Sequence, residues 1–198
     1  MAWSTRFICI SVLLLLSGCV AGQSIKLAYE PAPAAAEKLA IDVQVISTDQ
    51  RTFVVSGNKQ PNYIGHYRAG FGNTWDVTTQ NKLPLADNLR RDVSADLLAL
   101  GFNVVEKDAQ RILKIIVEDW NFDTYMNGKM WYQLHLAVAA ANGETVAESD
   151  LKDTVVIEGS IWVGAKYAFE RELPKIYMTV VNNIVRDNPQ ILTALKSQ

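Results

Sequence analysis

Two stretches decide the fold: RILKIIVEDWNF at residues 111–122 and MWYQLHLAVAAANG at residues 130–143. In both, apolar residues recur at every second position, which is typical of a β-strand with one buried face. Asn142-Gly143 is the strongest short hairpin signal in the chain, because both residues tolerate the positive φ angles of a tight turn. A second tight turn is expected at Asn127-Gly128. We therefore predict antiparallel strands over residues 111–122, 130–141 and 144–158, the last either continuous or broken near Asp150.

Two amphipathic helices flank these strands in the sequence. In residues 83–100, leucine and valine recur three or four positions apart, and Gly101 follows as a C-terminal cap. Arg90, Arg91, Asp92 and Asp96 point away from that apolar stripe. Residues 165–186 carry a wider stripe, in which Pro174 must either kink the helix or lie in its first turn. A short helix is expected over residues 190–196.

The order of elements predicts the fold class. Residues 41–47 alternate cleanly, with Ile41, Val43 and Val45 on one face, and residues 102–106 follow the first helix as a further strand. A strand, a helix, a run of antiparallel strands and a helix indicate α+β: a mostly antiparallel sheet with two main amphipathic helices packed on one face. Residues 49–82 show no period and are interrupted by glycines, so we expect a long loop, with room for a hairpin within it. Asp49-Gln50-Arg51 suggests a structural ion pair or turn.

The N-terminus predicts a lipoprotein signal. Arg6 precedes a predominantly apolar run over residues 7–16, too short for a bilayer-spanning helix of about 20 residues. Leu16-Ser17-Gly18-Cys19 matches a lipobox, in which Cys19 becomes the acylated N-terminus after cleavage. Stable anchoring takes two or more acyl chains, which lipidation of this kind supplies. An ordinary secretory signal that happens to contain a cysteine is the alternative.

These features divide the chain into three parts. Residues 1–18 are expected to be a cleaved signal peptide, residues 19–40 a lipidated cysteine and tether, and residues 41–198 a single α+β periplasmic domain. Pro31 and the alanines after it are typical of a semi-extended spacer, although residues 25–29 alternate and would suit a strand. In sorting that resembles that of enterobacteria, an aspartate after the cysteine retains a lipoprotein at the inner membrane, so by this resemblance Val20 implies the outer membrane, facing the periplasm.

Composition excludes several classes of function. Without Arg6, the chain has 18 basic and 21 acidic residues and no basic tract, so a nucleic-acid partner is not expected. Cys9 would leave with the signal, and Cys19 would be acylated, which excludes cysteine catalysis and disulfides. The remaining chain has two histidines, His66 and His135, and no recognisable catalytic or phosphate-binding motif. We expect no cofactor and no metal.

Acidic and aromatic residues supply the remaining candidates. Glu118, Asp119 and Asp123 could form a carboxylate pair for hydrolysis, but solvated strand positions are the favoured interpretation. Aromatic residues are more suggestive, since exposed contiguous aromatics mark binding surfaces. In a regular strand, Trp120 and Phe122 would lie opposite the apolar face of residues 113–117. The alternative is a second core layer covered by a helix or loop. The candidate binding surface comprises Trp120, Phe122, Trp131, Trp162 and Tyr67.

Several segments occur in an order and spacing that can be compared with known proteins: Leu16-Ser17-Gly18-Cys19, Asp49-Gln50-Arg51, residues 97–104, residues 113–117, the alanine-rich strand before Asn142-Gly143-Glu144, and residues 180–187. In this layout, the chain resembles the YajG-type outer-membrane lipoproteins of proteobacteria. The resemblance implies an uncharacterised lipoprotein facing the periplasm, without established catalytic residues to carry over.

Three functions follow, in order of preference. The first is a membrane-anchored lipoprotein, not an enzyme, that binds or scaffolds an envelope protein partner. The second is an auxiliary lipoprotein of a transport system for lipid or apolar cargo, which requires a continuous apolar groove between helices and sheet. The third is a carboxylate-dependent hydrolase, which requires two of Glu118, Asp119 and Asp123 within mutual reach in a cleft.

Overall fold

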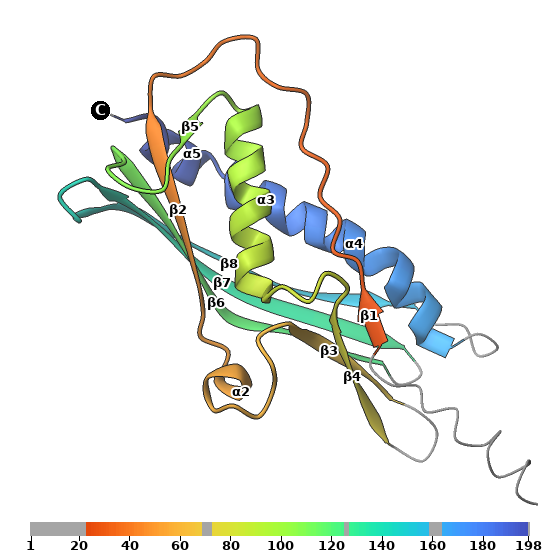
Figure 1. Ribbon diagram of the computed structural model, residues 1–198. Coiled ribbons are helices and arrows are strands. Elements are labelled where there is room, and N and C mark those ends of the chain that lie inside the picture. Colours follow the sequence, from red (N-terminus) through yellow and green to blue (C-terminus); the bar gives the residue numbers. More distant parts are fainter. Residues whose placement is uncertain (1–22, 69–72, 125–126, 159–163, 198) are drawn as a thin grey trace, which may run out of the picture.

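The computed structural model describes residues 23–68, 73–124, 127–158 and 164–197, which form one mixed sheet and four helices (Figure 1). The predicted lipidation site Cys19 lies outside these ranges. The strands are β1 (Gln23–Ile25), β2 (Asp42–Asp49), β3 (Tyr63–Arg68), β4 (Thr74–Thr79), β5 (Asn103–Val104), β6 (Arg111–Thr124), β7 (Gly128–Ala140) and β8 (Thr145–Ile157). The helices are α2 (Thr52–Val55), α3 (Leu85–Ala99), α4 (Gly164–Ile184) and α5 (Pro189–Lys196).

Strand β6 is the axis of the sheet. On one side it pairs antiparallel with β7, which pairs antiparallel with β8 across the predicted Asn142-Gly143 hairpin. On its other side the sheet branches: β2 pairs in parallel with residues 111–117, and β3 pairs in parallel with Asp123 and Thr124. β5 extends the β2 branch, and β4 and β1 extend the β3 branch. The sheet is therefore mixed, and the prediction of a mostly antiparallel sheet was only partly right.

Residues 49–82 are not the long loop that their irregular sequence suggested. They contain α2 and the antiparallel hairpin β3–β4, so the hairpin for which the prediction left room is present, and the rest of the segment is more ordered than predicted. The strands are six residues each, and a register shift between Tyr63 and Gly65 breaks their alternation. Short, bulged strands leave no period in the sequence, which explains why the pattern did not predict them.

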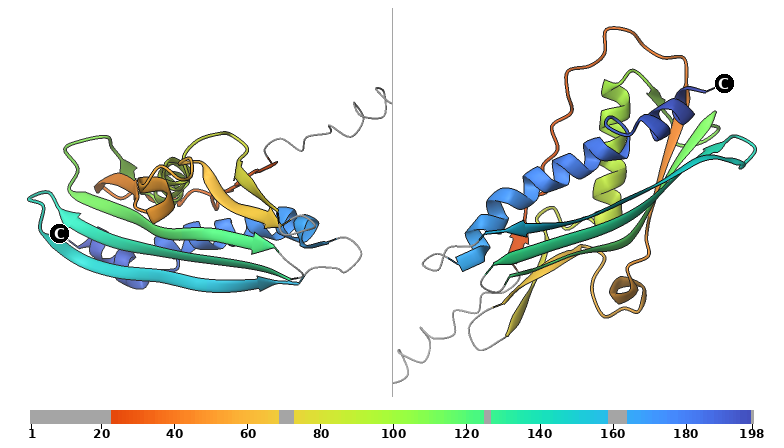
Figure 2. Two further views of the ribbon diagram at one scale, coloured as in Figure 1. Left: turned by 90° about the horizontal axis from the view of Figure 1, so that it is seen from below. Right: turned by 180° about the vertical axis from the view of Figure 1, so that it is seen from behind.

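The helices α3, α4 and α5 pack on one face of the sheet (Figure 1 and Figure 2). The helices predicted over residues 83–100, 165–186 and 190–196 are all present, with bounds shifted by one or two residues. Pro174 lies in the interior of α4, so the alternative that placed it in the first turn was wrong. β8 is continuous through Asp150.

The acidic side of α3 is buried against α4. Asp92 accepts a hydrogen bond from the Tyr177 hydroxyl at 2.7 Å, and fully buried Asp96 is paired with Arg186. The Tyr29 hydroxyl also donates to Asp96, at 2.7 Å. The two aspartates do face away from the apolar stripe, as predicted, but they join α3 to a second helix and do not contact solvent freely. A buried carboxylate needs such partners, because an unpaired one would cost several kcal/mol of desolvation.

The segment predicted as a tether packs against the domain over part of its length. Ile25 and Leu27 are buried, and β1 pairs with β4. Further along, the backbone of Ala35 donates to Ala99 at 2.8 Å, and that of Leu39 donates to Gly101 at 2.7 Å. Residues 23–40 thus run along α3 and are held at both ends.

Arg51 lies where the sheet branches, between the end of β2 and the start of β3. Its guanidinium is fully buried, donates to both carboxylate oxygens of Asp49 at 2.9 and 2.6 Å, and donates to the Tyr63 carbonyl at 2.7 Å. It also reaches the carbonyls of Pro61 at 3.1 Å and Trp120 at 3.4 Å. The ion pair predicted for Asp49-Gln50-Arg51 is confirmed, and Arg51 joins the end of β2 and the start of β3 to the interior of β6.

We expect Arg51→Ala to lower the free energy of unfolding by about 3–5 kcal/mol, because removing one partner leaves Asp49 and three carbonyls without their donor. Urea denaturation followed by circular dichroism measures this. Arg90→Ala is the matched control: its pair with Asp87 is exposed, at 3.7 Å, and such pairs contribute about 1 kcal/mol or less. Equal losses in the two variants would contradict the structural role of Arg51.

Candidate functional site

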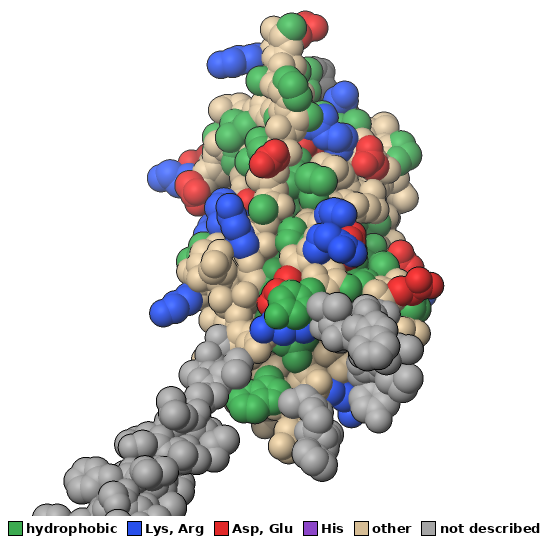
Figure 3. All heavy atoms as spheres, turned by 90° about the vertical axis from the view of Figure 1, so that its right-hand side faces the viewer, with side chains coloured by type: hydrophobic (Ala, Val, Ile, Leu, Met, Phe, Trp, Pro, Cys, Tyr) green, Lys and Arg blue, Asp and Glu red, His purple; other side chains and the backbone are tan. Residues whose placement is uncertain are grey.

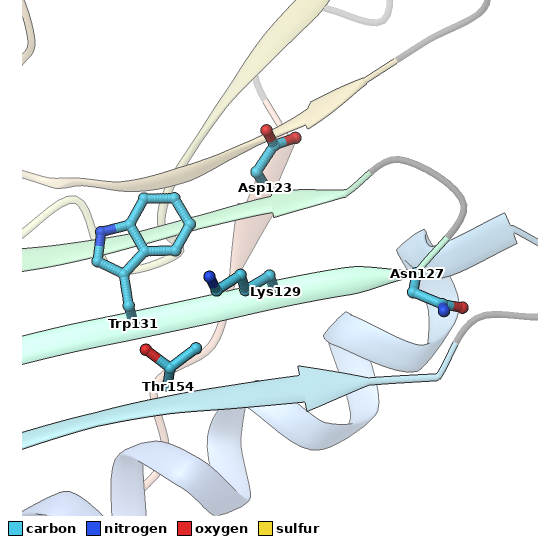
Figure 4. A pocket seen from close by; sticks show the side chains of 5 residues that line it. All are labelled: Asp123, Asn127, Lys129, Trp131 and Thr154. Carbon is cyan, nitrogen blue, oxygen red and sulfur yellow. The ribbon is translucent and has the colours of Figure 1, made fainter.

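The second face of the sheet is not covered by any helix of the described residues. Side chains of β6, β7 and β8 that alternate with the core positions point to this face, including Asp123, Trp131 and Thr154 (Figure 4). By the same alternation along β7, His135 also points there. An uncovered sheet face with mixed polar and aromatic side chains can contact a partner without rearranging the core. We therefore place the candidate site here.

Three residues of the predicted aromatic surface are in the core. Trp120, Phe122 and Tyr67 are buried, and Phe122 stacks on Phe169 of α4 at 4.7 Å between ring centroids. The cause is a β-bulge between Val117 and Asp119, which inserts one residue and moves Trp120 and Phe122 to the same face as residues 113–117. The prediction that they lie opposite was wrong, and the alternative of a core layer covered by a helix describes them. Trp162 lies outside the described residues.

Trp131 is the predicted aromatic residue that reaches the uncovered face. It is partly exposed, and its indole nitrogen donates to Asp119 at 2.9 Å, which fixes the ring. Beside it is an open hollow of about 560 Å³ (Figure 4). The hollow is lined by Asp123, Asn127, Lys129, Trp131 and Thr154, so it offers an aromatic ring, a carboxylate, an amide, an amine and a hydroxyl.

A chain of polar contacts runs along one side of the hollow. The Tyr63 hydroxyl donates to Asn121 at 3.0 Å and lies 3.1 Å from Nδ1 of His66. Nε2 of His66 lies 3.4 Å from Asp123, whose carboxylate also accepts from Arg68 at 2.7 Å. The hydrogen bonds from Arg68 lower the pKa of Asp123, and burial raises that of Tyr63. Tyr63 therefore stays protonated and Asp123 charged, which suits a rigid recognition surface better than proton transfer.

Each of the three candidate carboxylates is engaged by another side chain. Glu118 contacts Gln133, Asp119 holds Trp131, and Asp123 is engaged by Arg68 and His66. Asp119 and Asp123 are four residues apart on one strand, about 13 Å along it. The arrangement that a carboxylate-dependent hydrolase requires is therefore not favoured.

Sequence reasoning missed Lys129, Asn127 and Thr154 as members of the site. A signal was present: counting back from the Asn142-Gly143 turn places Trp131 opposite Thr154, which is the observed pairing. Lys129 then shares a face with Trp131 by strand alternation. The strand register alone does not predict which face of the sheet is left uncovered by helices, because that also depends on the bulge in β6.

No family model and no curated protein matches this sequence. A crystal structure of protein XCC0632 from Xanthomonas campestris, of the DUF330 family, covers 81% of this chain and 91% of its own at 14% identity and a TM-score of 0.54. This likeness shows the fold alone, which is that of a compact mixed α/β domain.

The structural neighbours also include uncharacterised lipoproteins. Lipoprotein B from Nitrosomonas europaea covers 84% of this chain and 93% of its own, at 14% identity and a TM-score of 0.43. Rare lipoprotein B from Shewanella oneidensis covers 79% and 99%, at 11% identity and a TM-score of 0.42.

Two further properties of the described ranges bear on the site. Within them, none of the helices has the length and apolar character needed to cross a membrane. Those same residues contain no cluster of three or more His, Cys, Asp or Glu side chains arranged to hold a metal ion.

We expect the pKa of His135 to lie above its ordinary value of about 6.5, because Nδ1 is 2.7 Å from Asp150 on the neighbouring strand. Glu148 and Glu118 act in the same direction. Since the folded pKa is raised, the contribution of this pair to stability is complete below pH 6.5 and is lost as the pH rises through the folded pKa. Titration of the imidazole C–H signals by NMR measures this.

Asp150→Asn should lower the pKa of His135, while Asp87→Asn, which removes a carboxylate on the covered side of the molecule, should leave it unchanged. A His135 pKa that did not respond to Asp150→Asn would show that the two side chains are not paired in solution.

Proposed function

We propose that this chain is a membrane-anchored lipoprotein of the bacterial envelope that binds a partner without catalysing a reaction. The hollow beside Trp131 carries this proposal: its aromatic ring is held in place by Asp119, and donors and acceptors surround it. Fixed aromatics with a polar rim are typical of recognition surfaces. The hydrogen bonds from Arg68 lower the pKa of Asp123 and keep its carboxylate ionised, which supports binding and not acid–base chemistry.

The anchor is proposed from the sequence. Leu16-Ser17-Gly18-Cys19 supports acylation of Cys19, and Val20 supports sorting to the outer membrane with the domain facing the periplasm. The resemblance to YajG-type lipoproteins supports the same assignment. We propose an envelope protein as the partner, which the uncovered sheet face would contact.

A transport role has less support. It requires a continuous apolar groove between helices and sheet, but the described residues fill that space with buried side chains such as Leu113, Trp120, Phe169 and Tyr177. The hollow beside Trp131 lies on the opposite face and has a polar rim, which suits a protein surface better than an acyl chain.

Cys19→Ala should abolish acylation and move the protein from the membrane to the soluble fraction of the envelope, because Cys19 supplies the acylated thiol. Mass spectrometry of the purified protein and fractionation of the expressing cells measure the two effects. A matched Cys9→Ala variant removes the other cysteine from the predicted signal and should remain acylated. Membrane association of the Cys19→Ala protein would contradict the proposed anchor.

The binding surface is tested with a photo-reactive residue in place of exposed Thr154, inside the hollow. In cells, this protein should form one discrete adduct with an envelope protein, and Trp131→Ala in the same chain should remove it. The same photo-reactive residue at Ile46, which is exposed on β2, should give no such adduct. Adducts that persist in the Trp131→Ala protein, or none at all, would contradict a partner at the hollow.

A further inference from the structure

Five strands and the longest helix meet at one end of the domain, which we call the strand-tip end. The register shows this: Tyr67 pairs with Trp75 and Thr124, Thr124 pairs with Gly128, and Gly128 pairs with Ile157. α4 begins at the same end, because Phe169 contacts Phe122 and lies directly over Gly128. Figure 1 shows these ends of the ribbon together at the lower right.

The predicted lipid anchor joins the domain at this same end. β1 begins at Gln23, which pairs with Val77, two residues from Trp75. Cys19 is four residues before Gln23, and four residues span at most about 14 Å. An acylated Cys19 would therefore hold the strand-tip end within that distance of the lipid, while the other end of β6 would lie about 40 Å farther along the strand.

Large apolar side chains are exposed at the strand-tip end. Trp75 is 39% exposed, Val156 is 62% exposed, and Tyr167 in the first turn of α4 is 61% exposed. Figure 3 views the molecule from this side and shows hydrophobic side chains among basic and acidic ones, next to the grey segments. Trp and Tyr prefer the boundary between water and lipid, where an apolar ring and a polar atom are both satisfied.

Electrostatic attraction to anionic lipid has little support at this end. Arg68 is paired with Asp123, Lys166 with Glu170 at 3.8 Å, and Lys59 with Asp76 at 2.6 Å. Each of these three basic groups is balanced by a carboxylate, so we expect apolar contact to contribute most of the attraction there. We therefore expect Trp75 and Tyr167 to insert into the interfacial layer of lipids with neutral headgroups as well as of lipids with anionic headgroups.

We propose that the strand-tip end lies against the lipid surface, with Trp75, Val156 and Tyr167 in its interfacial layer. This inference rests on the proposed acylation of Cys19, which sets the distance. It assigns the domain an orientation on the membrane, with the end that carries α5 and the Asn142-Gly143 turn directed away.

Spin labels test the orientation in the full-length acylated protein, in phosphatidylcholine vesicles with and without phosphatidylglycerol. The processed chain would have no cysteine other than acylated Cys19, so Val156→Cys and Tyr167→Cys each provide one labelling site. Val146→Cys is the matched control: it is also a valine of β8, is 43% exposed, and lies about 33 Å along the strand from Val156. Collision rates of the label with oxygen and with a water-soluble nickel complex are compared.

We expect labels at 156 and 167 to gain oxygen collisions and lose nickel collisions several-fold on vesicles of both compositions, and the label at 146 to stay aqueous. Flotation of the vesicles and mass spectrometry of Cys19 are measured on the same samples. Protein that is acylated and floats, but carries aqueous labels at 156 and 167, overturns the orientation and leaves the anchor intact. Protein that is not acylated overturns both proposals. Labels that become immobilised without gaining oxygen collisions would indicate a protein contact at this end and would also overturn the lipid assignment.

Discussion

The buried guanidinium of Arg51 is the contact on which the branching of the sheet depends. β6 is longer than β2, so two strands pair with it on that side. β2 ends at Asp49, and β3 begins at Tyr63 and pairs with the far end of β6. This gap would leave carbonyl groups of Pro61, Tyr63 and Trp120 without donors in a dry environment. Arg51 supplies those donors and is itself neutralised by Asp49. A planar fork with five N–H groups suits this position, and a lysine ammonium does not have that geometry.

The bulge at Glu118 is the second feature that shapes the sheet, and it lies beside the same gap between β2 and β3. Before it, the inward residues of β6 lie in the core with α3; after it, Trp120 and Phe122 continue the same core beneath α4. The inserted residue also turns Asp119 outward, where it holds the indole of Trp131. One extra residue therefore completes the core on one face and fixes the aromatic ring of the candidate site on the other.

Local patterns predicted the elements that such patterns encode. Alternation gave β2, β6 and β7, the Asn142-Gly143 turn gave the β7–β8 hairpin, and spacing at three and four residues gave α3 and α4. Features that depend on contacts distant in sequence were not predictable in this way. Asp92 and Asp96 appear as a solvated helix face until Tyr177 and Arg186, some 90 residues away, are placed against them. The face of the sheet to which Trp120 points depends on a bulge that no local sequence signal marks. The same bulge buries Phe122, so the exposure of the predicted aromatic surface could not be predicted either.

The position of the hollow relative to the proposed anchor connects the two parts of the proposed function, membrane anchoring and partner binding. Asn127 and Lys129, which line the hollow, are at the beginning of β7, and therefore at the strand-tip end. On a domain oriented by acylated Cys19, the hollow would open sideways, close to the membrane surface, and not toward the middle of the periplasm. A soluble partner would then meet steric hindrance from the bilayer, whereas a partner that is itself held at the same membrane would approach Trp131 along the surface. Confinement to one surface raises the effective concentration of both proteins, so a shallow hollow would suffice for binding.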